Sequence, residues 1–368
     1  MKMLYISSVP LPSPYANRLQ VVKMSEAFSK LCDFTLCISG IKGSAADVFK
    51  YYHVTKPFDI RELGRAPKYL RSVVYTWKAI RIVWKEKPDV IFVREAPLAF
   101  ALSFFFKPIV FEMHDFPEHR MWLHRILFSR VAFVISTNRW KAERLTEVFG
   151  VPAERLMYVP NGVDLSEFAV TQSPREAREK LGLPQNATIV LYSGQLFSWK
   201  GGDVLLSATK YLPNGISVYF VGGTEDDRKK VAETFPGYDK TKVTILPHQP
   251  HDLIPLYLRA ADVLIVPNTA REDISKFYTS PIKLFEYLAS KKPIVCSDIP
   301  SLREIISEEE VMFFTPDDPR DLARAIETTI ARIDDAARRI EKGFEKVRGY
   351  TWDSRAEAVL SFLRKNGL

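Results

Sequence analysis

Short apolar runs alternate with longer amphipathic stretches along almost the whole chain. The apolar runs are residues 3–7, 34–39, 89–94, 108–114 and 131–137, and later 188–194, 216–223, 242–247, 262–267, 292–298 and 311–316. Between them lie stretches with apolar residues at helical spacing, such as RLQVVKMSEAFSKL at 18–31. Continuous apolar runs are typical of parallel strands that are buried on both faces. The pattern therefore predicts an α/β protein with doubly wound, Rossmann-like parallel sheets.

The alternation pauses once, in the segment VPNGVDLSEF at 159–168, where a Pro-Asn-Gly turn precedes a polar stretch. A pause between two similar β-α-β blocks indicates two domains with a hinge, and the length of 368 residues agrees with two domains. We expect the first domain to comprise residues 1–165 and the second residues 166–350. A C-terminal helix at 352–368 is expected to cross back to the first domain.

The composition excludes several classes of protein. No stretch reaches the roughly 18 to 20 apolar residues of a membrane-spanning helix, and the nearest one, PLAFALSFFF at 97–106, predicts a buried helix. The N-terminal MKMLYISSVP is expected to be a first strand and not a signal peptide. The three cysteines have neither metal-ligand spacing nor a disulfide framework, which favours a cytoplasmic protein.

Basic residues are concentrated in the first half of the chain. Residues 1–165 contain 24 Lys and Arg against 15 Asp and Glu, a balance of +9, whereas residues 166–368 contain 28 against 29, a balance of −1. A basic face attracts anionic lipid head groups and other polyanions, and a solvated helix face is the alternative. We expect no nucleic-acid partner.

The segment RAPKYLRSVVYTWKAIRIVWKEK at 65–87 combines this charge with an apolar stripe. The stripe consists of residues at helical spacing, Tyr69, Val73, Trp77, Ile80 and Trp84, and the basic residues beside or opposite it are Lys68, Arg71, Lys78, Arg81 and Lys85. We expect the stripe to be buried, at least in part, against the first domain's sheet. The basic side chains favour reversible, charge-driven association with the inner face of an anionic membrane.

The segment TSPIKLFEYLASKKPIVCSDIPSLREII at 279–306 predicts an anion-binding helix start. Proline favours the first helical position, so Ser280 and Pro281 are expected to begin a helix whose N–H groups at 280–283 point at a phosphate. Lys283 adds positive charge there. Glu286 is then about 9 Å along the helix axis, which is roughly the distance from a phosphate to a ribose hydroxyl of the same nucleotide.

Three other strand ends carry polar residues that can contact a ligand. Gly194 permits close approach of a backbone, and Lys200 can reach a diphosphate from the same loop. His114 and Asp115 follow the apolar run at 108–114, and Asn17 and Arg18 lie at the start of the first helix. A histidine at a strand end is often structural, and Arg18 can simply begin its helix, so these assignments depend on their context.

Taken together, these segments resemble the family 4 glycosyltransferases of the GT-B fold. The resemblance rests on VPNGVD (159–164), YSGQLFSWKGGDVLL (192–206), VYFVGG (218–223) and the 279–306 segment, in that order along the chain. It implies two Rossmann-like domains facing across a cleft, an acceptor-binding first domain and a second domain that binds a nucleotide sugar. It also implies the transfer of a hexosyl-type sugar, with retention of configuration, to a glycan, a lipid-linked or a small-molecule acceptor in cell-envelope polysaccharide or glycolipid synthesis.

The resemblance assigns roles residue by residue. Glu286 matches the glutamate that binds the ribose, Lys200 the lysine on the donor phosphate, and His114 the first-domain histidine that orients the donor sugar. The family carries a pair of glutamates here, of which Glu286 is the second, and Tyr278 stands in place of the first. Gln195 stands where the family usually has an arginine. The expected donor-binding set is Gly194, Gln195, Lys200, Tyr278, Thr279, Ser280, Pro281, Ile282, Lys283 and Glu286, and the acceptor side comprises Asn17, Arg18 and Asp115.

Two missing motifs shape the chemistry that we expect. No strand end carries the Asp-x-Asp of metal-dependent sugar transferases, so we predict no metal and no other cofactor, and a UDP- or GDP-linked sugar as substrate. No G-x-G-x-x-G follows the first strand, which disfavours NAD binding. Because Tyr278 and Gln195 replace charged family residues, a catalytically weak nucleotide-sugar-binding subunit is the alternative, and a GT-B epimerase or phosphorylase is a third possibility.

Overall fold

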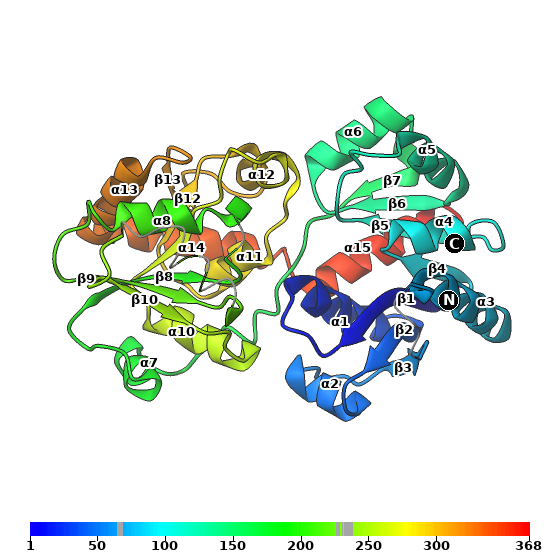
Figure 1. Cartoon of the computed structure of the whole chain (residues 1–368), viewed down its shortest axis with the longest axis horizontal. Helices are drawn as coiled ribbons and strands as arrows, with labels where there is room; N and C mark the ends of the chain where they lie inside the picture. Colours follow the sequence, from blue (N-terminus) through cyan, green and yellow to red (C-terminus); the bar gives the residue numbers. More distant parts are fainter. Residues whose placement is uncertain (65–68, 197, 226–228, 230, 232–237) are drawn as a thin grey trace. The chain divides into compact units, whose positions relative to one another are not determined.

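The computed structural model of the protein describes residues 1–64, 69–196, 198–225, 229, 231 and 238–368. It divides into two compact units (Figure 1). Unit 1 comprises Met1–Asn161 and Trp352–Leu368, and unit 2 comprises Gly162–Thr351. The division lies at Asn161 and Thr351, close to the positions 165 and 350 that the turn residues suggest.

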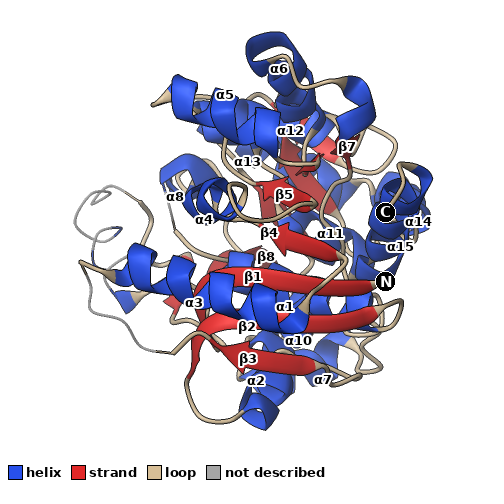
Figure 2. Ribbon diagram, turned by 90° about the vertical axis from the view of Figure 1, so that its right-hand side faces the viewer, coloured by secondary structure: helices blue, strands red, loops and turns tan. Residues whose placement is uncertain are grey.

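Unit 1 is built on a parallel sheet of seven strands in the order β3-β2-β1-β4-β5-β6-β7. The strands are β1 (Lys2–Leu11), β2 (Asp33–Ile41), β3 (Asp59–Glu62), β4 (Val90–Val93), β5 (Ile109–Met113), β6 (Phe133–Ser136) and β7 (Leu156–Tyr158). Figure 2 shows β3, β2, β1, β4 and β5 side by side in this order. The strand order reverses between β1 and β4, where open α/β sheets bind their ligands at the carboxyl ends of the strands.

Helices cover both faces of this sheet. They are α1 (Ala16–Ser29), α2 (Ala45–Tyr51), α3 (Arg71–Glu86), α4 (Ala96–Leu102), α5 (Met121–Arg130), α6 (Arg139–Phe149) and α15 (Trp352–Lys365), and η1 (Ala153–Arg155) is a short 3-10 turn. Helices α3, α4, α5 and α6 share one hydrophobic core with the sheet. On the other face, Phe28 of α1 contacts Phe92 and Phe362 of α15 contacts Phe133. The terminal helix therefore belongs to unit 1, as predicted.

Unit 2 repeats the architecture with six parallel strands in the order β10-β9-β8-β11-β12-β13. The strands are β8 (Thr188–Ser193), β9 (Ile216–Val221), β10 (Val243–Leu246), β11 (Val263–Val266), β12 (Ile294–Ser297) and β13 (Met312–Phe314). The α-helices are α7 (Pro174–Leu181), α8 (Gly202–Ala208), α10 (Ile254–Ala260), α11 (Ile282–Ala289), α12 (Pro300–Arg303), α13 (Pro319–Ala331) and α14 (Ile333–Val347). Short 3-10 turns η2 (Ser198–Lys200) and η3 (His251–Leu253) and a π-helical turn η4 (Ile274–Tyr278) complete the described elements.

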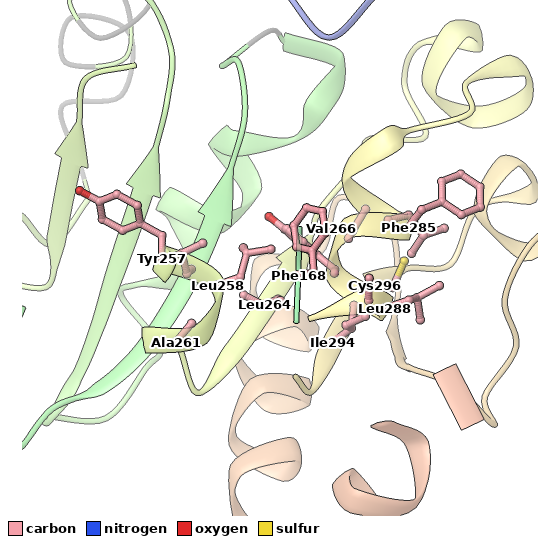
Figure 3. Packing of buried hydrophobic residues seen from close by; sticks show 14 of the residues in the cluster. Phe168, Tyr257, Leu258, Ala261, Leu264, Val266, Phe285, Leu288, Ile294 and Cys296 are labelled. Atoms are coloured by element: carbon pink, nitrogen blue, oxygen red, sulfur yellow. The ribbon is translucent and has the colours of Figure 1, made fainter. Parts of the chain in front are cut away.

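The strands of unit 2 alternate their side chains between two cores. Leu264 and Val266 of β11 face α10 and α11, where they contact residues such as Leu258 and Phe285 (Figure 3). Val263 and Ile265 of the same strand face α8 and α13. A strand that is apolar on both faces reads as a continuous apolar run, which is why these strands were predictable. The expected α/β fold of two Rossmann-like sheets is confirmed.

One predicted element differs from the structure and another is confirmed in part. The run at 97–106 is helical only in its first part, because α4 ends at Leu102, and Phe104 and Phe105 are 51% and 58% exposed. The stripe predicted on α3 is buried in part, as expected, because its member Ile80 faces the core. Tyr75, Ala79, Ile80 and Val83 face the core, whereas Trp77 and Trp84 remain 54% and 60% exposed. Helix α3 carries apolar residues on two adjacent stripes, and periodicity alone does not say which one a sheet accepts.

Candidate functional site

The end of β8 and the start of α11 lie side by side in unit 2. The hydroxyl of Tyr287 on α11 accepts a hydrogen bond from the backbone N–H of Ser193 at 2.7 Å and another from the Ser193 hydroxyl at 3.1 Å. Gly194 follows directly with φ +122, a conformation that side chains rarely adopt, and its N–H donates to the Val221 carbonyl at 2.9 Å. This arrangement brings the glycine loop onto α11, as the sequence motifs suggested.

Lys283 lies beneath this loop and is 8% exposed. The Nζ of Lys283 would lie 3.7 Å from a Cβ added at Gly194, and it lies 3.7 Å from the centre of the Tyr192 ring. Among the described residues, Nζ of Lys283 has no hydrogen-bond partner. Burial lowers the pKa of Lys283 well below its usual range, the nearby charge of Lys200 lowers it further, and Glu286 opposes this shift. A buried amine of this kind carries its charge at low cost only when an anion lies beside it, and otherwise releases its proton more easily.

Lys200 and Gln195 lie on the loop that leaves β8. Lys200 ends η2, and its Nζ lies 5.2 Å from the centre of the Trp199 ring. The Gln195 carbonyl accepts a hydrogen bond from the Tyr192 hydroxyl at 2.7 Å, which fixes the loop backbone. Gly201 follows with φ +70, and a Cβ there would lie 1.7 Å from the Pro267 carbonyl oxygen, so the loop packs directly on the end of β11. Lys283 is a further basic side chain beside this loop, which has Gln195 where the family usually has an arginine.

The helix start differs from the prediction. Helix α11 begins at Ile282, with Pro281 as its extended N-cap at ψ 117, and not at Ser280–Pro281. Proline has no N–H group, so the first-turn N–H groups are those of Ile282 and Lys283. Glu286 is consequently about 6 Å along the axis from the first helical residue, one turn from it, and not about 9 Å.

Glu286 is 9% exposed and has a neighbour that the sequence did not reveal. Nε2 of His251, in η3, lies 3.4 Å from Glu286 Oε1, and Nδ1 of the same ring lies 3.8 Å from Glu167 Oε2. His251 thus fixes the carboxylate that is expected to bind ribose. The segment HQPHDL at 248–253 contains this histidine, but only the fold brings it to α11.

The remaining donor-side positions precede α11. Tyr278 ends the π-helical turn η4 and is 7% exposed, so a tyrosine occupies the interior where the family has a glutamate. Thr279 continues in extended conformation, and Thr279 and Ser280 are half-buried. These residues link η4 to the N-cap of α11.

In unit 1, His114 follows β5 and contacts a buried carboxylate. Its Nε2 lies 3.0 Å from Oε2 of Glu112, which is fully buried, whereas the His114 side chain is 20% exposed. Burial lowers the pKa of His114 to about 4, with a further contribution from the charge of Arg94 and opposition from Glu112. The imidazole is therefore neutral at physiological pH and can form hydrogen bonds without carrying a charge.

The predicted acceptor-side residues lie at the carboxyl ends of β1, β4 and β5. Asn17 and Arg18 occupy the first turn of α1, and the Asn17 carbonyl accepts a hydrogen bond from Nη1 of Arg94 at 2.7 Å. Burial lowers the pKa of Arg18, and the neighbouring Arg94 adds to this effect. Asp115 is exposed. Arg18 and Arg94 thus place two positive charges at the point where the strand order of unit 1 reverses.

Helices α3, α4 and α5 pack on the same face of the sheet. The exposed large apolar side chains of these helices and of the residues beside them, which we refer to as the aromatic patch, are Tyr69, Leu70, Val73, Trp77, Trp84, Phe104, Phe105, Trp122 and Ile126. Arg81 lies 4.7 Å from the Trp77 ring centre and Arg130 lies 4.0 Å from that of Phe104. Lys68, predicted to flank the stripe, lies outside the described residues. Arginine side chains therefore lie against two of these exposed rings.

Two further properties of the described residues concern membrane and metal binding. No helix among them combines the length and the apolar composition that crossing a membrane requires. Nor do His, Cys, Asp and Glu side chains gather there in a group of three or more that could hold a metal ion. The absence of a metal requirement stays a prediction.

The chain matches two family models. Residues 20–167 match the model described as Glycosyltransferase Family 4, and residues 173–346 match the model described as Glycosyl transferases group 1. The chain belongs to the family 4 glycosyltransferases. The predicted family is thereby confirmed, and the two models cover most of unit 1 and most of unit 2, respectively.

A known relative of this family 4 chain matches it over part of its length. The D-inositol 3-phosphate glycosyltransferase of Xylanimonas cellulosilytica is 29% identical over 238 residues, which are 62% of this chain and 55% of the relative. The match thus spans little more than half the length of that relative.

Solved structures resemble the whole chain. HepE of Anabaena, solved in complex with UDP and glucose, has a TM-score of 0.81 at 18% identity and covers 100% of both chains. WaaG, described as a glycosyltransferase involved in lipopolysaccharide biosynthesis, has a TM-score of 0.71 at 13% identity and covers 97% of this chain and 98% of its own. At these identities the likeness shows the fold, which is that of the GT-B glycosyltransferases.

Proposed function

We propose that the protein is a metal-independent, retaining glycosyltransferase that takes a sugar from a uridine diphosphate sugar. The observation that carries this proposal is the buried Lys283 beneath Gly194, with Lys200 nearby and the first N–H groups of α11 at the same place. A nucleoside diphosphate supplies the anion that these groups lack. UDP is preferred over GDP because HepE, a protein of the same fold, was solved with UDP.

The chemistry follows from where charge develops. As the bond between the sugar and the diphosphate breaks, negative charge grows on the leaving phosphate, and fixed positive groups stabilise the transition state more than the ground state. Lys200 and Lys283 act there, and Glu286, fixed by His251, binds the ribose hydroxyls. The retaining course is the one that the family resemblance implies, with the leaving phosphate accepting the proton of the acceptor hydroxyl.

Donor choice and metal dependence are tested directly. UDP- and GDP-sugars are compared by thermal shift, because a ligand that binds the native state raises the melting temperature. We expect uridine nucleotides to give the larger shift. Transfer is then measured with and without EDTA, and the anomeric configuration of the product is determined by NMR. A loss of transfer in EDTA that Mg²⁺ or Mn²⁺ restores, or an inverted product, contradicts the proposal.

The alternative is a catalytically weak nucleotide-sugar-binding subunit. It is supported by Tyr278 and Gln195, which replace charged residues of the family. Binding without hydrolysis or transfer, across a panel of donors and acceptors, would favour this alternative. The cation at Lys283 favours catalysis, because it restores the positive charge that Gln195 does not supply.

We further propose that the enzyme works at the inner face of a membrane on a lipid-linked acceptor. The support is the aromatic patch of α3, α4 and α5, with Arg81 and Arg130 against its rings. Tryptophan is favoured at the membrane interface, and each basic residue near an anionic leaflet contributes about 1 kcal/mol. Salt therefore weakens the association without abolishing it, because the aromatic part does not depend on charge.

Liposome co-sedimentation tests the patch. We expect binding to anionic vesicles, much weaker binding to neutral ones, and a loss of most binding when Trp77 and Trp84 are both replaced by Ser. Ile333→Ser is the matched control, because Ile333 is 74% exposed and belongs to unit 2. Equal binding to neutral and anionic vesicles, or none at low salt, leaves a soluble sugar or small metabolite as the acceptor.

A further inference from the structure

Glu112 is the centre of a buried polar cluster in unit 1. It projects from β5 and is fully buried, between residues of α1 and α15. Nη2 of Arg355 donates to its Oε1 at 2.5 Å, Nε2 of Gln20 lies 3.1 Å and 3.0 Å from its two oxygens, and His114 Nε2 lies 3.0 Å from Oε2. Arg355 and Gln20 are themselves 3% and 1% exposed. Most of the carboxylate's hydrogen-bonding capacity is therefore used inside the protein.

The chemistry of a carboxylate decides which nitrogen of His114 carries a proton. Burial raises the pKa of the Glu112 carboxyl, but the charge of Arg355 and the hydrogen bond to His114 outweigh this effect and hold the pKa well below its usual value. An ionised carboxylate accepts hydrogen bonds and donates none. Nε2 of His114 must therefore carry a hydrogen, and in a neutral ring Nδ1 is then an acceptor.

We propose that Glu112 is a positioning residue that fixes His114 in the Nε2–H tautomer, so that Nδ1 accepts a hydrogen bond from a hydroxyl of the transferred sugar. Arg355 acts indirectly in the same way, because it binds the Glu112 carboxylate that in turn orients the His114 ring. This inference rests on the proposed glycosyltransferase function for its ligand, but the tautomer itself does not depend on turnover.

Arg355 also connects this cluster to the boundary of the unit. Its Nε donates to the carbonyl of Pro160 at 2.8 Å, one residue before unit 1 gives way to unit 2 at Asn161. A single side chain from the C-terminal helix thus contacts both the chain crossover and the carboxylate behind His114. The position of the crossover and the orientation of His114 are fixed by the same buried guanidinium group.

The tautomer is measured by NMR. Protein labelled with ¹⁵N-histidine is examined by long-range ¹H–¹⁵N correlation, and the His114→Gln variant assigns the signal. We expect the Nε2–H form in the wild type, unchanged between pH 5 and pH 8. Burial lowers the pKa of His114 to about 4, with contributions from the charges of Arg94 and Lys141 and opposition from Glu112.

The Glu112→Gln variant separates positioning from packing. Arg355 needs the single amide oxygen, so the amide NH₂ faces His114 and the ring must switch to the Nδ1–H form. We then expect kcat/KM to fall by about 10- to 100-fold through the lost acceptor, while the Kd for UDP, which has no sugar, changes less than about twofold. Arg355→Lys is the second variant to examine if Glu112→Gln fails to fold. It keeps a cation and the Glu112 carboxylate, so His114 should remain in the Nε2–H form.

Glu26→Gln is the matched control. Glu26 is another buried carboxylate of unit 1, 4% exposed, and accepts hydrogen bonds from Thr55 and Lys56 without contacting His114. It should lower the melting temperature and leave the tautomer and kcat/KM unchanged. In a His114→Ala background, Glu112→Gln should cause no further loss of kcat/KM, because the two residues act as one unit.

Distinct results overturn this inference. They are an Nδ1–H tautomer in the wild type, an unchanged tautomer in Glu112→Gln, or losses in kcat/KM that add in the double variant. A protein that transfers no sugar from any donor would overturn the proposed function instead, and the tautomer measurements would still decide the role of Glu112.

Discussion

Replacing Lys283 with Met should make the protein more stable and its binding of UDP weaker. Its ammonium group is buried and, among the described residues, has no hydrogen-bond partner. Leaving a buried polar group without a hydrogen-bond partner costs about 1–3 kcal/mol, and an apolar side chain of similar size removes this cost. A gain of about 2 kcal/mol raises the melting temperature of a unit this size by about 4–8 °C.

The same substitution removes a charged contact to the diphosphate. Losing a charge-assisted hydrogen bond costs about 1.5–3 kcal/mol, so the Kd for UDP should rise by about 10- to 150-fold. Isothermal titration calorimetry measures this change and the melting temperature is followed by circular dichroism. The two effects have opposite signs, which distinguishes a ligand-binding lysine from a structural one.

The pH dependence follows from the direction of the pKa shift. The folded-state pKa of Lys283 is lowered, so the unfolded chain binds more protons and stability rises with pH up to the ordinary pKa of lysine. Each pH unit between the two pKa values changes the free energy of unfolding by about 1.4 kcal/mol. UDP binding raises the pKa again, so binding should take up as much as one proton. Calorimetry in two buffers of different ionisation enthalpy detects this uptake, and Lys283→Met should abolish it.

Lys292→Met is the matched control. Burial lowers the pKa of Lys292 to about 8, but its Nζ donates to the Ala261 carbonyl at 2.6 Å, so this lysine has a partner inside the protein. Its replacement should bring little or no gain in stability and should leave UDP affinity and proton uptake unchanged. A Lys283→Met protein that melts below the wild type, or binds UDP equally well, would refute the reasoning.

Other substitutions test the rest of the donor site. Glu286→Ala should weaken UDP binding by about 2–3 kcal/mol in calorimetry with the fold intact by circular dichroism, and an unchanged affinity would show that Glu286 does not bind the nucleotide. Lys200→Ala should lower kcat more than it raises KM, because charge on the leaving phosphate grows in the transition state; a rise in KM alone would indicate simple anchoring. Gly201→Ala should destabilise unit 2 by at least about 2 kcal/mol in thermal melts, because its Cβ would overlap the Pro267 carbonyl oxygen.

The periodicity of the sequence was sufficient for the fold. Strands such as β8 and β11 are apolar on both faces because helices cover both, and this produces the continuous runs from which they were predicted. The same strand and helix assignments placed His114 and Gly194 at strand ends and Glu286 in a helix, whereas their roles came from the family resemblance and stay predictions. The position of each of these residues on its strand or helix is set by the residues next to it in the sequence.

Contacts between distant segments were not predictable from the chain alone. The pairs Glu286–His251 and Glu112–Arg355 join residues on separate elements, and no short spacing marks them. The start of α11 was misplaced for a different reason, because proline serves as an N-cap as well as a first helical residue. Of the stripe predicted on α3, Ile80 is buried together with Tyr75, Ala79 and Val83, and helical periodicity alone did not distinguish this face from the one that carries Trp77 and Trp84.

The surroundings of His114 in unit 1 differ from those of Lys200 and Lys283 in unit 2, and they suit the side chains to different tasks. A group that stabilises the leaving phosphate must carry positive charge, and Lys200 and Lys283 of unit 2 meet this requirement when the diphosphate is bound. His114 cannot share that task, because its pKa of about 4 leaves the half-buried ring neutral at physiological pH. Its Nε2–H is taken by Glu112, so what remains for a ligand is the lone pair of Nδ1, which recognises a hydroxyl and not a phosphate. In the reaction that we propose, His114 of unit 1 would orient the sugar, and Lys200 and Lys283 of unit 2 would stabilise the charge on the leaving phosphate.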